Sequence, residues 1–343
     1  MGDRHIDGIS GGTGHEVLDQ LVGTAPAFRN IVRQLPILAR TDAIVLITGE
    51  TGTGKELVAQ ALHRLGPRAT RPFVAVNCGA LVDTLLEGEL FGHERGAFTD
   101  ARERRPGLIV QAAGGTVFLD EAEALSPRAQ VALLRVLQER TVRALGSIAE
   151  QRVDVRFVAA TNVNLEGLVQ SGRFRVDLYY RLCVFSLSLP PLRERREDIA
   201  SLAEFFIARH SPSPIKPKLA PAAEDALLAY EWPGNVRELE SAIVRAVHVA
   251  RDGSIQPSDL GLPSPRDVDA GWRPAPDPSS GSYKFAKRRV LDAFERQYLS
   301  RLMKEHGGNV TRAARAAGKE RRDLGKLLKR HGLDPRRFVA SAA

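Results

Sequence analysis

A run of eight residues in the first fifth of the chain has the composition of a loop that binds nucleotide phosphates. It consists of Gly49, Glu50, Thr51, Gly52, Thr53, Gly54, Lys55 and Glu56. In such a loop the glycines let backbone N–H groups converge on phosphate oxygens at a helix N-terminus, and the lysine reaches the β and γ phosphates. The usual Ser or Thr that binds magnesium is replaced by Glu56, so Mg²⁺ must depend on other groups. The sequence therefore predicts an ATP site.

The segments on either side of the loop must place it between a strand and a helix. Residues 43–47 form an apolar run, and after the loop the apolar residues Leu57, Val58, Ala61 and Leu62 have helical spacing. Strand, glycine turn and helix form the context that this motif requires. A purely structural glycine turn is the alternative, and these flanking elements favour the phosphate loop.

Two adjacent carboxylates, Asp120 and Glu121, end the apolar run over residues 114–119. Asp120 can hold magnesium directly or through water, and Glu121 can polarise the water that attacks the γ phosphate. The pair could also begin a helix, because the sequence from Glu123 onward is helix-like. The phosphate loop favours the catalytic interpretation.

A third apolar run, over residues 155–160, ends in Thr161 and Asn162, where a polar side chain could contact the γ phosphate. The segment that follows carries three arginines, Arg173, Arg175 and Arg181. Arginines that reach a neighbour's nucleotide can stabilise the charge that develops during phosphoryl transfer. From charge alone, a solvated basic helix is the simpler interpretation.

A second motif contains a phenylalanine between small residues. It consists of Gly96, Ala97, Phe98, Thr99, Asp100 and Ala101, and charged stretches lie on both sides. An aromatic side chain in such a setting is unlike a core residue, and an exposed one usually marks a point of partner binding.

Composition indicates a soluble protein with two or more domains. The chain has 343 residues, of which 43% are hydrophobic and 26% charged. No segment resembles a membrane span, and the N-terminus lacks the apolar core of a signal peptide, so we expect a cytosolic protein without membrane contact. The two cysteines, Cys78 and Cys183, lie in apolar stretches without metal-type spacing and are expected to be structural thiols.

The net charge of +8 is unevenly distributed. Residues 283–343 contain 17 Lys and Arg and 6 Asp and Glu, a charge of +11 (17 − 6), which leaves −3 for the rest of the chain (8 − 11). A basic tail on a mildly acidic body is typical of a nucleic-acid-binding module, although other polyanions fit the charge equally well. A stretch rich in Pro, Ser and Gly precedes the tail and is predicted to be a linker.

The tail has the pattern of a helix-turn-helix. A long amphipathic helix is expected over residues 290–303, and Asn309 is a plausible N-cap for a helix over 310–317. A third helix is expected over 319–330. Its apolar residues Leu324, Leu327 and Leu328 would face inward while its basic residues face outward. Two short helices around a glycine turn, the second basic on its outer side, are typical of this motif.

Several of these motifs, in this order, resemble the AAA+ domain of bacterial sigma-54-dependent transcriptional activators, the enhancer-binding proteins. The resemblance runs from about residue 22 to about residue 250. It includes the phosphate loop, Glu89 to Glu94 followed by Gly-Ala-Phe-Thr-Asp-Ala, Phe174-Arg175 through Arg181-Leu182, Leu189 to Arg195, and Trp232 to Leu239.

The resemblance implies roles for individual residues. Lys55, Asp120 and Glu121 would bind and hydrolyse MgATP, with Asp120 as the metal ligand. Glu56 stands where this family also usually has Glu. Asn77 would hold Glu121 until the remodelling target engages.

The remaining AAA+ motifs also match positions in this chain. Thr161 and Asn162 match the first sensor, and Arg237 matches the second sensor on the helical lid. Arg175 and Arg181 match arginine fingers donated across a ring interface. Val176 replaces the acidic residue that usually follows the first finger.

The motif over residues 96–101 resembles the loop tip that contacts sigma-54, which usually reads Gly-Ala-Phe-Thr-Gly-Ala. Phe98 and Thr99 match the proposed contact pair, and Asp100 replaces a more permissive glycine. We interpret this change as a tolerated variant, and a loop without sigma-54 contact is the alternative.

The tail resembles the Fis-type DNA-binding domain of this family, whose first helix pairs two subunits. The residues expected at the DNA are Thr311, Arg312, Glu320, Arg321, Arg322, Lys326, Lys329 and Arg330. Those at the start of the last helix would lie nearest the bases, and Lys329 and Arg330 would meet phosphates.

The predicted fold is an α/β AAA+ P-loop core with a helical lid, followed by an all-α helix-turn-helix domain. The expected boundaries are 1–17 for an N-terminal extension, 18–189 for the α/β core, 190–260 for the lid, 261–283 for the linker and 284–343 for the DNA-binding domain. Because the core begins so early, no sensor domain is expected, and we expect control by a separate regulatory protein or by expression level.

The expected function is activation of sigma-54 RNA polymerase. The protein would bind upstream DNA, assemble into an ATPase ring, which the family suggests is a hexamer, and use ATP with Mg²⁺ to remodel the holoenzyme toward the open complex. One alternative is an ATP-binding, DNA-bound regulator or repressor that does not use sigma-54, and another is an unfoldase or helicase motor. The loop over 96–101 and the helix-turn-helix favour the activator.

Overall fold

A computed structural model describes residues 18–97, 103–211, 216–250 and 253–262. In the C-terminal part it describes 295, 299–300, 302–303, 306–317, 319, 321–331 and 333–335. The chain divides into two compact units, Met1–Leu262 and Pro263–Ala343. The expected extension over 1–17 lies outside the described residues, and so does the expected linker over 261–283 apart from its first two residues.

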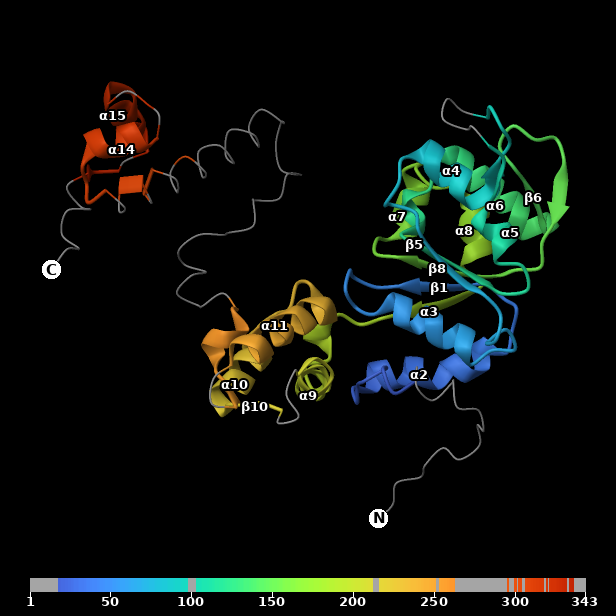
Figure 1. Ribbon diagram of the computed structural model, residues 1–343, viewed down its shortest axis with the longest axis horizontal. Helices are drawn as coiled ribbons and strands as arrows, with labels where there is room; N and C mark the ends of the chain where they lie inside the picture. The colour runs from blue at the N-terminus through green and yellow to red at the C-terminus, as the bar shows by residue number, and fades with distance from the viewer. Residues whose placement is uncertain are drawn as a thin grey trace, which may run out of the picture. The chain divides into compact units, whose positions relative to one another are not determined.

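The first unit is built on a sheet of five parallel strands (Figure 1). In spatial order the strands are β2 (Phe73–Asn77), β5 (Thr116–Asp120), β8 (Arg156–Thr161), β1 (Val45–Thr48) and β9 (Phe185–Ser188). Within β1, which lies between β8 and β9, Val45 pairs with Val158 on one side and with Phe185 on the other. All strands point the same way, so their carboxyl ends, where ligands bind in open α/β sheets, share one edge.

Helices cover both faces of this sheet (Figure 1). One face carries α2 (Pro26–Ala39) and α3 (Lys55–Arg64). The other carries α4 (Asp83–Phe91), α5 (Leu108–Gln111), α6 (Pro127–Glu139), α7 (Leu165–Gln170) and α8 (Val176–Leu182). Side chains alternate between the two cores, as the period of a strand requires. In β1, Val45 and Ile47 pack with α2 and α3, whereas Leu46 packs on the opposite face.

A buried arginine joins the ends of two helices on the first face. Arg156, at the start of β8, is 2% exposed. Its guanidinium donates to the carbonyls of Leu38 at 2.8 Å, Ala39 at 3.0 Å and Leu62 at 3.2 Å. Carbonyls in the last turn of a helix have no partner within the helix, so this cation satisfies the C-terminal ends of both α2 and α3.

Two hairpins project from the core on the side of α4 and α6. The first pairs β3 (Gly92–His93) with β4 (Arg105–Pro106), and the second pairs β6 (Thr141–Arg143) with β7 (Glu150–Arg152). They are joined by backbone hydrogen bonds from Leu145 N to Gly92 O and from Glu94 N to Leu145 O.

The lid is a helical subdomain with a core of its own. Its elements are η2 (Leu192–Glu194), α9 (Asp198–His210), β10 (Lys218–Leu219), α10 (Pro221–Ala229), α11 (Asn235–Val249), β11 (Ser254–Ile255) and η3 (Pro257–Leu260). Trp232 is fully buried at its centre, and its indole N–H donates to Leu227 O at 2.9 Å. Asp198 links the lid to the core because its carboxylate accepts from the amides of Thr24 and Ala25 at the start of α2.

The described part of the second unit contains α14 (Val310–Ala316) and α15 (Arg321–Arg330). The Asn309 side chain accepts from the amides of Thr311 and Arg312, as expected for an N-cap. Leu324 and Leu328 are buried with Leu299, Met303 and alanines of α14. Both helices are slightly shorter than expected, and most of the residues in the helix expected over 290–303 lie outside the described part. None of the helices in the described ranges has both the length and the apolar character of a membrane span.

Candidate nucleotide-binding site

The phosphate loop connects β1 to α3 as predicted. Gly49, Gly52 and Gly54 have φ angles of 152°, 80° and 102°, a region that other residues rarely adopt. Lys55 begins α3 and is 9% exposed. Its ammonium donates to Gly49 O at 2.8 Å and to Glu50 O at 3.1 Å.

Three carboxylates act electrostatically on this lysine. Asp120 ends β5, and Glu121 follows with a left-handed φ of 53°. Burial lowers the pKa of Lys55, while the negative charges of Asp120, Glu123 and Glu121 act in the opposite direction. The structure thus brings the lysine and the predicted acidic pair together, and adds Glu123.

Asn77 lies beside Glu121. Asn77 pairs with Asp120 across the parallel strands β2 and β5, and its side-chain oxygen accepts from Gly79 N at 2.8 Å. A Cβ atom placed on Gly79 would lie 2.2 Å from Glu121 Oε2 and 3.4 Å from Asn77 Oδ1. The two predicted residues therefore both border Gly79.

Asn162 bridges the end of β8 and the phosphate loop. Its Nδ2 donates to Thr51 Oγ1 at 3.4 Å, and its backbone N–H donates to Glu123 Oε1 at 3.4 Å. Thr161 is 1% exposed, and its hydroxyl donates to Val163 O at 3.2 Å. Both predicted sensor residues contact the loop, Asn162 through its side chain and Thr161 through its carbonyl, which accepts from Gly49 N at 3.3 Å.

A cavity of about 340 Å³ opens between the phosphate loop and the lid. Arg237 lines it together with Gly52, Gly54, Lys55, Glu56, Asp120, and apolar residues of α9 including Leu202 and Phe206. Glu56 is exposed, and its carboxylate accepts from Gln60 Nε2 at 3.3 Å. A polar end at the phosphate loop and an apolar wall suit a nucleotide.

Comparison with known proteins matches both the α/β core and the lid of this chain to protein families. A sequence profile of the Sigma-54 interaction domain matches residues 21–188, and one of the AAA+ ATPase lid domain matches 193–265. The transcriptional regulatory protein ZraR of Klebsiella oxytoca is 46% identical over 312 residues, covering 90% of this chain and 68% of that protein. The response regulator protein PilR of Pseudomonas aeruginosa is 44% identical over 318 residues, covering 92% and 70%. The chain belongs to the sigma-54-dependent transcriptional regulators.

Solved structures agree with this assignment. The crystal structure of NtrX from Brucella abortus matches with a TM-score of 0.68 and 35% identity, covering 93% of this chain and 71% of that one. The same protein in complex with ATP matches with a TM-score of 0.66. The AAA+ fold, nucleotide binding, ATPase activity and sigma-54-dependent transcriptional activation are thereby confirmed.

The loop over residues 96–101, which is predicted to contact sigma-54, begins at the β3–β4 hairpin. Gly96 has a φ of 81°, and Ala97 packs close to Gly146, whose added Cβ would lie 3.1 Å from Ala97 Cβ. The predicted contact residues Phe98, Thr99, Asp100 and Ala101 lie outside the described residues. The base of the loop is thus fixed against the second hairpin by the hydrogen bonds of Leu145.

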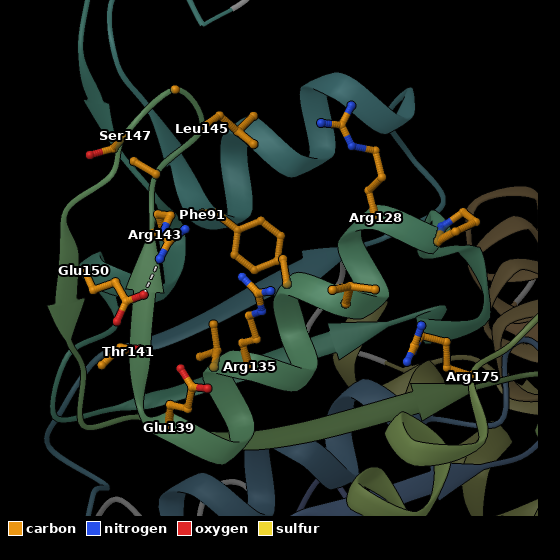
Figure 2. Close-up of a pocket in the computed structure, with 16 residues that line it drawn as sticks. Phe91, Arg128, Arg135, Glu139, Thr141, Arg143, Leu145, Ser147, Glu150 and Arg175 are labelled. Carbon is orange, nitrogen blue, oxygen red and sulfur yellow. Dashed lines mark hydrogen bonds and ion pairs between the residues drawn. The ribbon is translucent and has the colours of Figure 1, made fainter.

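The predicted arginine fingers lie away from the activator's own nucleotide cavity. Arg175 stands at the N-cap position of α8 and makes no capping side-chain hydrogen bond; its guanidinium instead binds Asp177 through Nε at 3.0 Å and Nη2 at 2.7 Å. Arg181 Nη2 donates to Leu137 O at 3.2 Å. Figure 2 shows Arg175 at the edge of a second hollow, of about 560 Å³, which Arg128 and Arg135 of α6 also line.

Of the predicted DNA-binding residues, seven lie in the described part of the second unit. Arg321, Arg322, Lys326, Lys329 and Arg330 are exposed along α15, and Thr311 and Arg312 are exposed on α14. Glu320 lies outside the described residues.

Sequence reasoning missed four residues of the site: Glu123, Arg193, Arg195 and Asn235. Glu123 begins a helix-like stretch of sequence, and this pattern does not predict a place beside the lysine. The other three fall within the motifs of the lid, but nothing in their spacing pairs them with the phosphate loop, more than a hundred positions earlier. The Glu50 side chain, predicted at the nucleotide, instead binds Arg193 and Asn235.

Proposed function

We propose that this activator hydrolyses MgATP at the loop between β1 and α3 and uses the reaction to move the 96–101 loop against sigma-54 holoenzyme. The observation that carries the proposal is the meeting of Lys55, Asp120 and Glu121 at the carboxyl edge of the sheet. Lys55 binds the β and γ phosphates, and Glu121 accepts the proton of the attacking water. Asn77 positions the Glu121 carboxylate across Gly79.

The residues present fit a magnesium ion. Mg²⁺ takes oxygen ligands, keeps several waters and is usually held by one or two carboxylates and the substrate phosphates. In the described part of the chain no cluster of His, Cys, Asp and Glu would hold a metal without such help, and Glu123 Oε2 is buried there without a hydrogen-bond partner. Asp120 would hold the ion, with Glu123 compensating its charge. A bound Mg²⁺ would neutralise part of the negative charge that develops on the phosphates.

The arginine fingers act between subunits of a ring in this proposal. Arg175 and Arg181 stabilise the γ phosphate of the ATP bound to a neighbouring subunit. Asn162 and Arg237 instead contact the γ phosphate of the ATP bound to their own subunit. The support is that both arginines lie on α8 and its N-cap, apart from the cavity that Arg237 lines. A hexamer is the assembly that we propose.

The second unit holds the activator on upstream DNA as a dimer. The support is the outward row of cations on α15 and the excess of positive charge in residues 283–343. Phe98 and Thr99 then contact sigma-54, and Asp100 is tolerated. Promoters and polymerase lie in the bacterial cytoplasm, so we place the protein there.

Open-complex formation by sigma-54 RNA polymerase on a sigma-54 promoter tests this function. The intact chain should open the promoter with ATP, and Thr99→Ala and Glu121→Gln should both abolish opening. Glu121→Gln should also abolish hydrolysis, whereas Thr99→Ala should retain it. If the intact chain hydrolyses ATP and opens no promoter, the role of the 96–101 loop is refuted.

A further inference from the structure

The lid contacts three consecutive carbonyls of the phosphate loop. Thr51 O accepts from Asn235 Nδ2 at 3.0 Å, Gly52 O from the Arg237 backbone N–H at 3.3 Å, and Thr53 O from Arg195 Nη2 at 3.1 Å. The two carbonyls before them bind Lys55 Nζ. The lid therefore satisfies the second half of the loop.

These contacts determine where the loop's amides point. A trans peptide unit is planar, so its C=O and the N–H of the following residue point in opposite directions. Carbonyls held by the lid turn the amides of Gly52 and Gly54 to the other side, while the Thr53 N–H donates to Glu50 O within the loop at 3.4 Å. Convergent amides of this kind form an anion-binding concavity, so the contacts that orient the carbonyls also orient the phosphate donors.

Asn235 is the residue on which this arrangement depends. It is fully buried and has a φ of 54°, a conformation that Asn tolerates better than most residues. Its Oδ1 accepts from Leu192 N at 2.8 Å, and its Nδ2 also donates to Glu50 Oε2 at 3.1 Å. The approach is close, because a Cβ on Gly52 would lie 2.3 Å from Gly234 O.

The Glu50 carboxylate also forms an ion pair with Arg193 of the lid. Arg193 Nη2 donates to Glu50 Oε1 at 2.6 Å and Nη1 to Oε2 at 2.8 Å, a bidentate geometry. Arg195 is 2% exposed, and its guanidinium carbon lies 4.6 Å from the centre of the Phe28 ring. Arg193, Arg195 and Asn235 thus hold the loop from the lid, and we refer to these residues with Glu50 as the lid clamp.

We propose that the lid clamp consists of positioning residues that make the affinity for nucleotide phosphates depend on the position of the lid. A lid in the observed position keeps the amides of the loop aligned, and a displaced lid releases the carbonyls of Thr51 and Thr53. Coupling of this kind is reciprocal, so phosphates bound at the loop also favour the observed lid position. The proposal rests on nucleotide binding alone and is independent of the ring and of DNA.

The sharpest variant is Asn235→Asp. Aspartate keeps the size, tolerates the same backbone conformation and can still accept from Leu192 N. It loses the donor to Thr51 O and brings a second carboxylate next to Glu50. The Kd for ATP should rise about tenfold. The Kd for AMP, which has no β or γ phosphate for the loop to bind, should change by less than about twofold.

A double-mutant cycle tests the ion pair on folded protein. Glu50→Ala, Arg193→Ala and the double variant are compared for ATP affinity, and the double variant should be no weaker than either single one because the two residues act as one unit. Arg196→Ala is the matched control. It removes the ion pair of the lid between Arg196 and Glu231, which does not touch the loop, and should leave the Kd for ATP unchanged.

The Tm of each nucleotide-free variant shows whether the lid clamp positions the phosphate loop or only stabilises the contact between lid and core. Equal loss of ATP and AMP affinity, additive effects in the cycle, or a lower Tm with unchanged Kd for ATP would each overturn the proposal, since the contacts would then only join lid and core. If Asn235→Asp does not fold, the exposed Arg193→Ala decides between the same outcomes with the same two nucleotides.

Discussion

The Glu121 carboxylate lies directly over Gly79, so close that a Cβ on Gly79 would stand 2.2 Å from Glu121 Oε2. The contact is with the end of a flexible side chain, so an alanine at residue 79 would displace the carboxylate rather than the backbone. The distance between these two residues thus controls where the proposed general base stands.

Gly79→Ala should therefore lower kcat for ATP hydrolysis by about tenfold or more, since a misplaced general base loses much of its effect. The Kd for ATP should stay within about twofold, because the phosphate loop is untouched. Steady-state kinetics and equilibrium binding measure the two. Gly167→Ala is the control, because its Cβ would meet nothing nearer than 4.0 Å. Unchanged kcat in Gly79→Ala would contradict the assignment of Glu121.

Stability should depend on pH through Glu50. Hydrogen bonds from Arg193 and then Asn235 lower its pKa from 4.5 to about 2. A carboxyl with a lowered pKa stabilises the folded state above its unfolded pKa and loses this effect as the pH falls through the folded value. The difference in unfolding free energy between the natural chain and Glu50→Gln should be constant above about pH 4.5 and shrink toward pH 2. Denaturant unfolding at several pH values measures it, and a difference independent of pH would refute the pairing.

Removing the buried cation between α2 and α3 should destabilise the core. Arg156→Met leaves the carbonyls of Leu38, Ala39 and Leu62 without their donor, and we expect a loss of about 3 kcal/mol in the free energy of unfolding. Arg64→Met changes the same side chain at an exposed position and should cost about 0.5 kcal/mol or less. Urea denaturation of both variants checks the contrast, and equal losses would show that the buried contacts contribute little.

DNA binding should divide the cations of α15 into two classes. Lys329→Ala should weaken binding to all sequences and reduce the slope of log K against log salt by about 1. Arg322→Ala should weaken binding mainly to the specific site, because base contacts carry sequence preference. Fluorescence anisotropy at several salt concentrations, with specific and random duplexes, distinguishes the two. Identical effects of both variants on both duplexes would contradict the proposed orientation of the helix.

Local patterns in the sequence were sufficient to predict the strand, loop and helix around Lys55, the carboxylates after β5 and the N-cap at Asn309. Each depends on residues a few positions apart. The contacts of Glu50 and Arg156 could not be predicted in this way, because they are made by residues far along the chain and require the packing of the whole unit. Arg156 even begins a strand that looks apolar, and only the ends of α2 and α3 explain a charge there.

The place of β1 inside the sheet, between β8 and β9, has a consequence for biosynthesis. This strand leaves the ribosome early, yet both of its neighbours, β8 and β9, begin only at residues 156 and 185. At ordinary rates of translation the wait is on the order of ten seconds. During that time an apolar strand has unpaired edges on both sides, so the nascent chain is expected to be a client for chaperones until the second half of the core has emerged.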